Sequence, residues 1–386
     1  MQAIIDIREN LKKLQWEKIL IITLCLYLSI LHVGMTTFNI TDVSKVVLKC
    51  ARYLCYIVFF INILITFNYS KNDFKYYILF GICGVVTLFS KDVSVMILLI
   101  ILFSVKNISK EKLIKLAFYT NLTILLVTMI CSLIGIIPNW TFVRNNVQLR
   151  YSLGYQFCTF ASTYLFFIIL ARFYINKGKI NYIESALMAF AAVVIYYFGD
   201  SRTGFILILL ILLSSAVVQL FEKVKINDKI IDVLKNILKY VCYVLPTFLA
   251  ISFIFLIFMY RIGSPWIKEI DKILTGRLNY TNIAIEKYGI TLLGQKIKWQ
   301  GWGGYGYTVF EQFDYNFVDN SNMKILLNYG IVSLATLLYV FTKKLVNEYN
   351  KKDYYLIYCL IIVLLWTFIE PSLLELDKNI FMLTFV

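Results

Sequence analysis

The sequence lacks the motifs that mark common metal sites, catalytic triads and nucleotide sites. It has one histidine, His32, with no cysteine or carboxylate placed to join it, which argues against a zinc site and a Ser–His–Asp triad. It has no P-loop and no Gly-rich nucleotide fingerprint, so this chain alone is not expected to drive transport with ATP. Its eight cysteines lie in or beside apolar segments without a CxxC pair. We expect them to pack as small apolar residues rather than to form disulfides or bind metal.

Charge is also scarce. Only 16% of the 386 residues are charged and 60% are hydrophobic, whereas about a quarter of the residues of a soluble domain are charged. A bilayer can accommodate such a chain if its backbone is helical or forms a closed barrel. Because the apolar segments are continuous rather than alternating, we predict an all-α polytopic membrane protein, with residues 1–386 as a single integral membrane domain.

Apolar runs of roughly 17–25 residues are long enough to span a membrane as helices. By this measure we predict about 11 transmembrane helices, within a range of about 10–12. They lie near residues 18–34, 46–67, 74–90, 92–105, 114–137, 155–173, 181–198, 203–221, 239–259, 322–342 and 354–370. The last apolar piece, Ile380–Val386, is too short to cross, and we expect it to lie at the outer interface or to end the chain early.

The positive charges fall mainly on alternate loops. Segments such as 106–115 and 223–239 are rich in lysine, whereas the short loops between them carry one or two cations each. Cytoplasmic loops of membrane proteins carry the excess of Lys and Arg, so the pattern predicts a cytoplasmic N-terminus. The net charge of +15 is then topological, and no nucleic-acid partner is expected. Residues 260–321, between the ninth and tenth spans, become one long extracytoplasmic loop containing amphipathic helices, the first over 265–278.

Arginine is concentrated on the predicted outer side or in the spans, whereas the inner loops are almost all lysine. Arginine grips phosphate with two parallel hydrogen bonds and lysine acts as a point charge. The set therefore predicts binding of a phosphorylated lipid or an acidic polymer. The alternative is that each arginine pairs with lipid headgroups or structural carboxylates. The arginines in question are Arg52, Arg144, Arg150, Arg202, Arg261 and Arg277.

A tight turn, Gly199–Gly204, separates two predicted spans and contains Asp200 and Arg202. The two charges could form a purely structural pair. Alternatively, Arg202 beside the first backbone amides of the next helix would make an anion site. The residues alone favour neither interpretation.

The long loop combines glycine with aromatic rings at Gly301–Tyr307, which includes Trp302 and Tyr305. Flat rings suit the apolar faces of sugars, although the same pattern could anchor the loop at the membrane interface. Asp314 and Asp319 follow just before the tenth span, and Glu370 ends the eleventh span on the same side.

Several short motifs together resemble a known family. Ser201–Gly204 opening a span, and Arg150 to Gly154 entering an earlier one, resemble the Wzy-type polysaccharide polymerases and the related O-antigen ligases. The order of four further motifs is similar to the capsular and exopolysaccharide polymerases of Gram-positive bacteria. These are Thr275–Leu278, Glu286–Gly289, Tyr315–Ser321 and Leu326–Gly330.

The resemblance implies a glycosyltransferase in the bacterial plasma membrane that works on its outer face. It would transfer a growing glycan on undecaprenyl pyrophosphate to an incoming lipid-linked oligosaccharide unit, with membrane lipid, a chain-length regulator and a flippase as partners. Related ligases rely on a histidine in the outer loop, and this loop has none. The alternatives are a ligase-like glycan transferase and a lipid-linked oligosaccharide flippase.

The residues then suggest roles for the predicted reaction. Asp319 would orient or deprotonate the acceptor hydroxyl, with Asp200, Asp314 and Glu370 as further candidates. Arg202, Arg150 and Arg277 would stabilise the leaving pyrophosphate. No metal or cofactor is expected, because arginine can supply the positive charge. The residues expected to bind pyrophosphate or sugar are Arg144, Arg150, Asp200, Arg277, Trp302, Tyr305, Asp314 and Glu370.

Overall fold

The computed structural model describes residues 2–66, 74–144, 148–221, 227–301 and 316–385. These residues are mostly helical, and they include one antiparallel hairpin, β1 (Thr141–Arg144) with β2 (Gln148–Tyr151). The helices are α1 (Gln2–Gly34), α2 (Asp42–Thr66), α3 (Phe74–Ser90), α4 (Ser94–Ser104), α5 (Lys110–Leu133), α6 (Phe160–Ile175), α7 (Tyr182–Gly199), α8 (Arg202–Phe221), α9 (Asp228–Ile262), α10 (Pro265–Ile273), α11 (Arg277–Tyr288), α12 (Ser321–Asn350) and α13 (Tyr354–Thr367).

Each predicted span coincides with a helix. Within the described ranges, seven helices are long and apolar enough to cross a membrane, namely α1, α2, α5, α7, α8, α9 and α12. Four further apolar helices, α3, α4, α6 and α13, have fewer than 18 residues. By the length and composition of these helices, the chain is a multi-pass helical membrane protein.

The sequence sets the start of several helices through capping side chains. In each case the side chain accepts a hydrogen bond from a backbone N–H in the first turn, which would otherwise have no partner. The capping residues are Ser109 for α5, Asn181 for α7, Asn227 for α9, Asn320 for α12 and Asp353 for α13.

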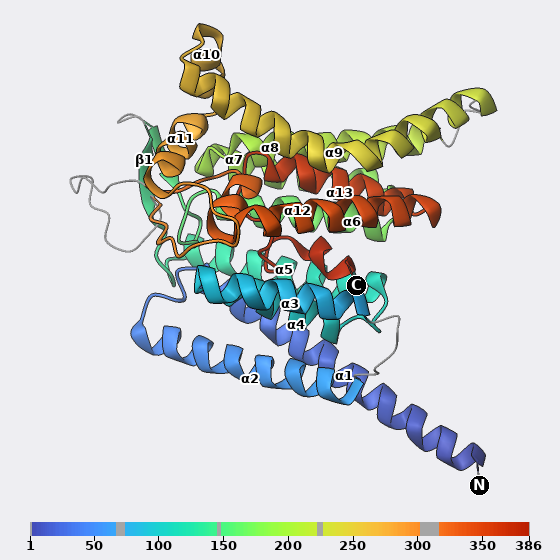
Figure 1. Cartoon of the computed structure of the whole chain (residues 1–386). Helices are drawn as coiled ribbons and strands as arrows, with labels where there is room; N and C mark the ends of the chain where they lie inside the picture. The colour runs from blue at the N-terminus through green and yellow to red at the C-terminus, as the bar shows by residue number, and fades with distance from the viewer. Residues whose placement is uncertain (1, 67–73, 145–147, 222–226, 302–315, 386) are drawn as a thin grey trace.

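The helices form a bundle in which segments far apart in the sequence are neighbours (Figure 1). Successive contacts run from α1 through α2, α4, α3, α12, α13, α6 and α5 back to α1, while α7, α8 and α9 pack outside this circuit. The hairpin, the α7–α8 turn, α10 and α11 lie together at one end of the bundle, on the left of Figure 1. We call this end the loop end.

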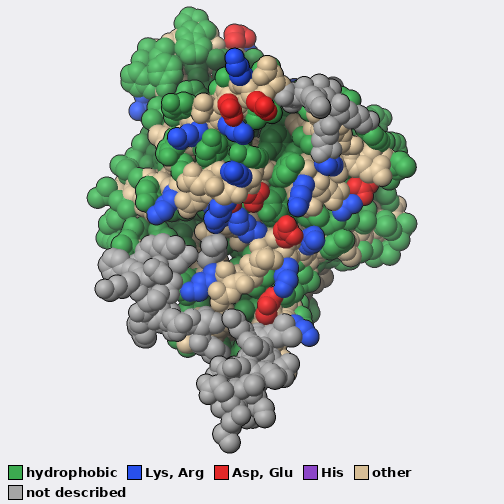
Figure 2. Space-filling model, turned by 90° about the vertical axis from the view of Figure 1, so that its right-hand side faces the viewer, with side chains coloured by type: hydrophobic (Ala, Val, Ile, Leu, Met, Phe, Trp, Pro, Cys, Tyr) green, Lys and Arg blue, Asp and Glu red, His purple; other side chains and the backbone are tan. Residues whose placement is uncertain are grey.

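The opposite end of the bundle is rich in positive charge (Figure 2). Three of its turns connect α4 to α5, α6 to α7 and α12 to α13, and they contain Lys106, Lys177, Lys179, Lys351 and Lys352. Apolar side chains surround this charged surface in Figure 2, as expected where a bundle leaves the hydrocarbon region.

The segment between α9 and α12 differs from its prediction in one detail. Instead of one helix over 265–278, there are two helices, α10 and α11, separated by a turn. Thr275 and Gly276 have positive φ angles of 56° and 81°, which end the first helix. The Asp271 carboxylate then accepts a hydrogen bond of 2.8 Å from the Leu278 N–H and starts the second.

The C-terminal segment, residues 368–385, overturns a prediction. Rather than lying at an interface, it runs back into the bundle beside α5 and ends in a 3₁₀ turn at Ile380–Thr384, in which all five side chains are buried. Non-helical backbone at membrane depth is tolerated only where the protein satisfies its polar groups. Side chains of the helices do so here, because Asn121 donates to the Asp377 carbonyl at 2.9 Å and Lys344 donates to the Thr384 carbonyl.

The helix α12 is broken at Gly330, where φ is 81° and ψ is 178°. The segment 291–295 packs against the break and hydrogen-bonds to its backbone. The Ile331 N–H donates to the Thr291 carbonyl at 3.1 Å, and the Gln295 N–H donates to the Asn328 carbonyl at 2.9 Å. A sharp kink arises where another group interrupts the hydrogen bonds of a helix, and here the segment 291–295 supplies that group. A Cβ at Gly330 would lie 2.4 Å from the Leu292 carbonyl oxygen.

We therefore expect Gly330→Ala to destabilise the protein far more than Gly289→Ala. Gly289 has a similar backbone, with φ 68° and ψ 178°, but a Cβ added there would meet no atom within 4 Å. Gly289→Ala should cost about 1–3 kcal/mol of backbone strain. Gly330→Ala adds about 1–3 kcal/mol of overlap with fixed backbone. Thermal unfolding of the two purified variants in detergent measures the difference. Equal losses of stability would show that the segment 291–295 does not stabilise the kink at Gly330.

Candidate functional site

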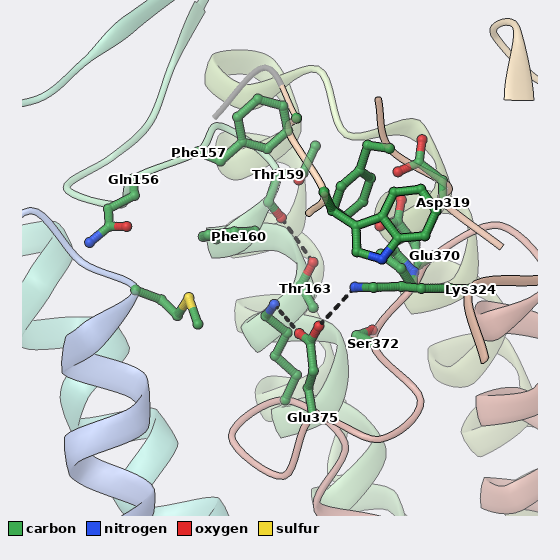
Figure 3. Close-up of a pocket in the computed structure, with 16 residues that line it drawn as sticks. Gln156, Phe157, Thr159, Phe160, Thr163, Asp319, Lys324, Glu370, Ser372 and Glu375 are labelled. Atoms are coloured by element: carbon green, nitrogen blue, oxygen red, sulfur yellow. Dashed lines mark hydrogen bonds and ion pairs between the residues drawn. The ribbon is translucent and has the colours of Figure 1, made fainter. Parts of the chain in front are cut away.

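A cavity of about 390 Å³ lies near the loop end, between the start of α6, the start of α12 and the segment after α13. In Figure 3, Phe157, Phe160 and Thr163 face Asp319, Glu370 and Lys324 across the space, with Glu375 below them. The cavity thus combines aromatic rings with charged groups of both signs. This is the usual composition of a site for a polar ligand with apolar faces.

One wall carries two carboxylates that share an arginine. Arg277 Nε lies 3.5 Å from Asp319 Oδ2, and Arg277 Nη2 lies 3.3 Å from Glu370 Oε1. Both carboxylates line the cavity. The side chains of Arg277, Asp319 and Glu370 are 16%, 25% and 18% exposed, so the cluster is largely removed from solvent.

Backbone carbonyls and the start of α12 hold this cluster in place. Arg277, the first residue of α11, donates to the carbonyls of Ile369 at 3.0 Å and Leu274 at 3.1 Å. Asn320 donates to the Phe368 carbonyl at 2.8 Å, and Ser321 donates to the Glu370 carbonyl at 2.5 Å. The segment after α13 is therefore pinned to both α11 and α12, which brings Glu370 beside Asp319.

Burial is the main influence on the two acids. It raises the pKa of Glu370 to about 7; Arg277 opposes this increase and Asp319 adds to it. Burial also raises the pKa of Asp319, against the effects of Arg277 and Lys324. Glu370 therefore changes its protonation state near neutral pH, as a general base or acid does.

A second wall carries two lysines that share a carboxylate. Lys324 Nζ lies 3.7 Å from Glu375 Oε1, and Lys378 Nζ lies 2.5 Å from Glu375 Oε2. Each ammonium group also lies over an aromatic ring: Lys324 is 4.8 Å from the centre of the Phe317 ring, and Lys378 is 4.5 Å from that of Phe160. The lysines are thus fixed in position by both an ion pair and a ring.

The predicted residues of the α7–α8 turn form a different cluster. Arg150 Nε donates to the Gly199 carbonyl at 2.8 Å, which makes it a support of the turn. Arg202 is 62% exposed and its Nε lies 3.5 Å from the Asp200 carboxylate. The described residues that line the cavity include none from α7 or α8. The structure therefore brings Asp319, Glu370 and Arg277 together, but it does not bring Arg150, Asp200 or Arg202 to them.

The remaining predicted residues are not placed. Trp302, Tyr305 and Asp314 lie outside the described residues, and for Arg144 the structure gives the backbone, at the end of β1. Their predicted roles in binding sugar or pyrophosphate stay predictions.

His32 belongs to a buried polar network beside the cavity. Its ring nitrogens lie 3.0 Å from Asn121 Oδ1 and 2.9 Å from the Tyr155 hydroxyl, and its ring stacks on Tyr164. The Tyr164 hydroxyl donates to Asp377 at 2.6 Å. This network joins α1, α5 and α6 to the C-terminal segment, so we assign the only histidine a structural role.

The lysine wall was not predicted from the sequence. Lys324 follows the predicted motif at Tyr315–Ser321, and Glu375 and Lys378 lie in the short charged run Glu375–Lys378. A signal was present, since charged residues inside an apolar C-terminal stretch are costly in a membrane protein and mark functional positions.

Comparisons of the chain with protein-family models, with curated proteins and with solved structures find no match.

Proposed function

We propose that this protein is a polysaccharide polymerase, a membrane glycosyltransferase that joins oligosaccharide units carried on undecaprenyl pyrophosphate. The supporting observation is the cavity, in which a carboxylate pair with Arg277 faces aromatic rings and lies beside a lysine pair. A glycosyl transfer from a diphosphate needs a group that takes the acceptor proton and cations that stabilise the leaving diphosphate. Aromatic rings suit the apolar faces of the sugars.

The proposed reaction is a single displacement. The acceptor hydroxyl oxygen attacks the anomeric carbon of the donor glycan, and Glu370 or Asp319 takes the hydroxyl proton. The bond between the anomeric carbon and the diphosphate oxygen breaks, and its electron pair stays on the diphosphate. The configuration at the anomeric carbon therefore inverts.

Glu370 is the better candidate for the base. Its pKa of about 7 is close to the pH at which the enzyme would work, so the unprotonated form is present and still basic. Asp319 remains the second candidate, because it lines the same wall. Arg202 is proposed to bind lipid headgroups rather than the reacting diphosphate, because it is exposed and its turn does not line the cavity.

The same proposal includes the finer topology. The four shorter apolar helices are proposed to complete eleven spans. The lysine-rich end shown in Figure 2 would face the cytoplasm of a bacterium, together with the N-terminus. The loop end, with the cavity, would then face the outside of the plasma membrane, where lipid-linked units are polymerised.

The test is glycan analysis of a strain that lacks the gene and carries the wild type, Glu370→Gln, Asp319→Asn or Arg202→Ala. The proposal expects long polymer only with functional cavity acids, whereas Arg202→Ala retains it. Without the gene, single lipid-linked units should accumulate on the outer leaflet. If they accumulate on the inner leaflet instead, the protein is a flippase, and the buried Asp377 with its Tyr164 partner would be the first residue to study as a transport group.

A further inference from the structure

The charges of the cavity are separated into two halves. The half around Arg277 has two carboxylates for one cation, and the half around Glu375 has two ammonium groups for one carboxylate. With all these groups ionised, the second half holds an excess positive charge and the first an excess negative charge. A ligand with an anionic group and a hydroxyl group would therefore enter in one orientation.

We propose that Lys324 and Lys378 form the subsite for the leaving diphosphate, a role that the sequence had suggested for arginines. This inference rests on the proposed function, because it takes the diphosphate from the lipid-linked donor. The Glu375 carboxylate shows that one anion can contact both ammonium groups, since its two oxygens lie 3.7 Å from Lys324 and 2.5 Å from Lys378. A phosphate group has the same kind of oxygen pair.

The unequal distances indicate where the phosphate enters. The Lys324 contact of 3.7 Å is longer than a hydrogen bond, so this ammonium keeps donors for a second anion. Lys324 is 21% exposed and lines the cavity. Lys378 is 8% exposed and lies deeper, where a short contact with Glu375 and the Phe160 ring hold it. The diphosphate would contact Lys324 first and share Lys378 with Glu375.

Arg277 is not suited to this task. Its donors are directed to the carbonyls of Ile369 and Leu274 and to Thr275 and Glu370, at 2.6–3.3 Å. It is therefore a positioning residue that fixes the carboxylates. The acceptor hydroxyl would lie on their side of the cavity and the diphosphate on the lysine side, with the anomeric carbon between them.

The binding of inorganic pyrophosphate to the purified protein, measured by calorimetry in phosphatidylcholine nanodiscs, tests the subsite. Lys324→Met and Lys378→Met should each weaken binding by about tenfold or more, because each removes one charge-assisted contact. Glu375→Gln should strengthen it, because the competing carboxylate is gone. The matched control is Lys272→Met, since Lys272 is 73% exposed on α10 and paired with Glu269. It should bind pyrophosphate as the wild type does.

The result that would overturn the proposal is unchanged pyrophosphate affinity in both lysine variants, provided that their thermal unfolding shows them folded. If Lys378→Met does not fold, Lys324→Met and Glu375→Gln still test the idea in opposite directions. Anionic phospholipid is another source of the same chemistry. Undecaprenyl pyrophosphate should displace pyrophosphate, whereas phosphatidylglycerol in the nanodisc should not; displacement by phosphatidylglycerol alone would contradict a diphosphate subsite.

The proposed diphosphate subsite and the proposed polymerase reaction can each be rejected without rejecting the other. Pyrophosphate binding that depends on the lysines, in a protein that makes no polymer, would retain the subsite and reject the reaction. Polymer formation that persists in both lysine variants, with unchanged pyrophosphate affinity, would retain the reaction and reject the subsite.

Discussion

Replacement of Arg277 by alanine is expected to lower both the stability of the protein and its polymer synthesis. It removes the only cation within salt-bridge distance of Asp319 and Glu370 among the described residues, and it removes the hydrogen bond to the Ile369 carbonyl. Breaking a buried ion pair on one side costs about 3–5 kcal/mol, and the partial exposure of these groups reduces this to about 2–3 kcal/mol. Thermal unfolding in detergent and polymer analysis of the complemented strain measure the two effects.

Two further variants separate the effect of Arg277→Ala on stability from its effect on polymer synthesis. The neutral triple variant Arg277→Met, Asp319→Asn and Glu370→Gln leaves no charge of this cluster buried without a partner, so it should recover most of the stability and none of the activity. Arg261→Ala is the control, because Arg261 is 50% exposed and 3.9 Å from Glu286. It should cost less than about 1 kcal/mol. If Arg261→Ala destabilised the protein as much as Arg277→Ala, the ion pairs of the cavity would be no more important for stability than an exposed surface pair.

Replacement of Glu370 by glutamine is expected to lower polymer synthesis by about 10²–10⁴-fold, the usual contribution of a general base. The same change should not destabilise the protein at pH 8, because it removes a carboxylate that burial makes difficult to ionise. An enzyme that loses activity while keeping its thermal stability has lost a chemical group rather than its fold. If Glu370→Gln lost thermal stability together with activity, Glu370 would instead have a structural role.

The pH dependence follows from the raised pKa of Glu370, about 7. In the folded protein the carboxyl stays protonated at pH values where the unfolded chain has already released its proton. Its contribution to stability is therefore complete below the unfolded pKa of about 4.5 and is lost as the pH rises to about 7. Relative to Glu370→Gln, the wild type should lose stability over this range.

Activity should change in the opposite sense over the same range. The base must be unprotonated, so the acid limb of the wild-type pH profile should lie near pH 7, and the residual activity of Glu370→Gln should lack this limb. Glu286→Gln is the matched control, because Glu286 is 60% exposed at the same end of the bundle. It should leave both the stability and the pH profile unchanged. An acid limb that persists unchanged in Glu370→Gln would show that Glu370 is not the base, and a wild-type limb near pH 4.5 would show that its pKa is not raised.

The sequence by itself determined that the chain is a multi-pass helical membrane protein and roughly where its helices lie. Long apolar runs, capped by residues such as Asn320 and Asp353, are local signals that need no tertiary contact. It also selected Asp319 and Glu370, because they lie at the ends of predicted spans, and Arg277, because it is one of the few arginines on the predicted outer side. It could not rank them above Arg202, since charge and sequence position do not reveal which residues share a cavity.

Only the tertiary structure decided which charges meet. Arg277 and Glu370 are far apart in the chain, and the bond from Ser321 to the Glu370 carbonyl helps to bring their segments together. The apolar piece Ile380–Val386 was too short to be predicted as a span, and the burial of the C-terminal segment depends on donors from α5 and α12 at Asn121 and Lys344. Its entry into the bundle places Lys378 and Glu375 beside Lys324. The site is therefore formed by long-range packing, which apolar periodicity and residue composition do not encode.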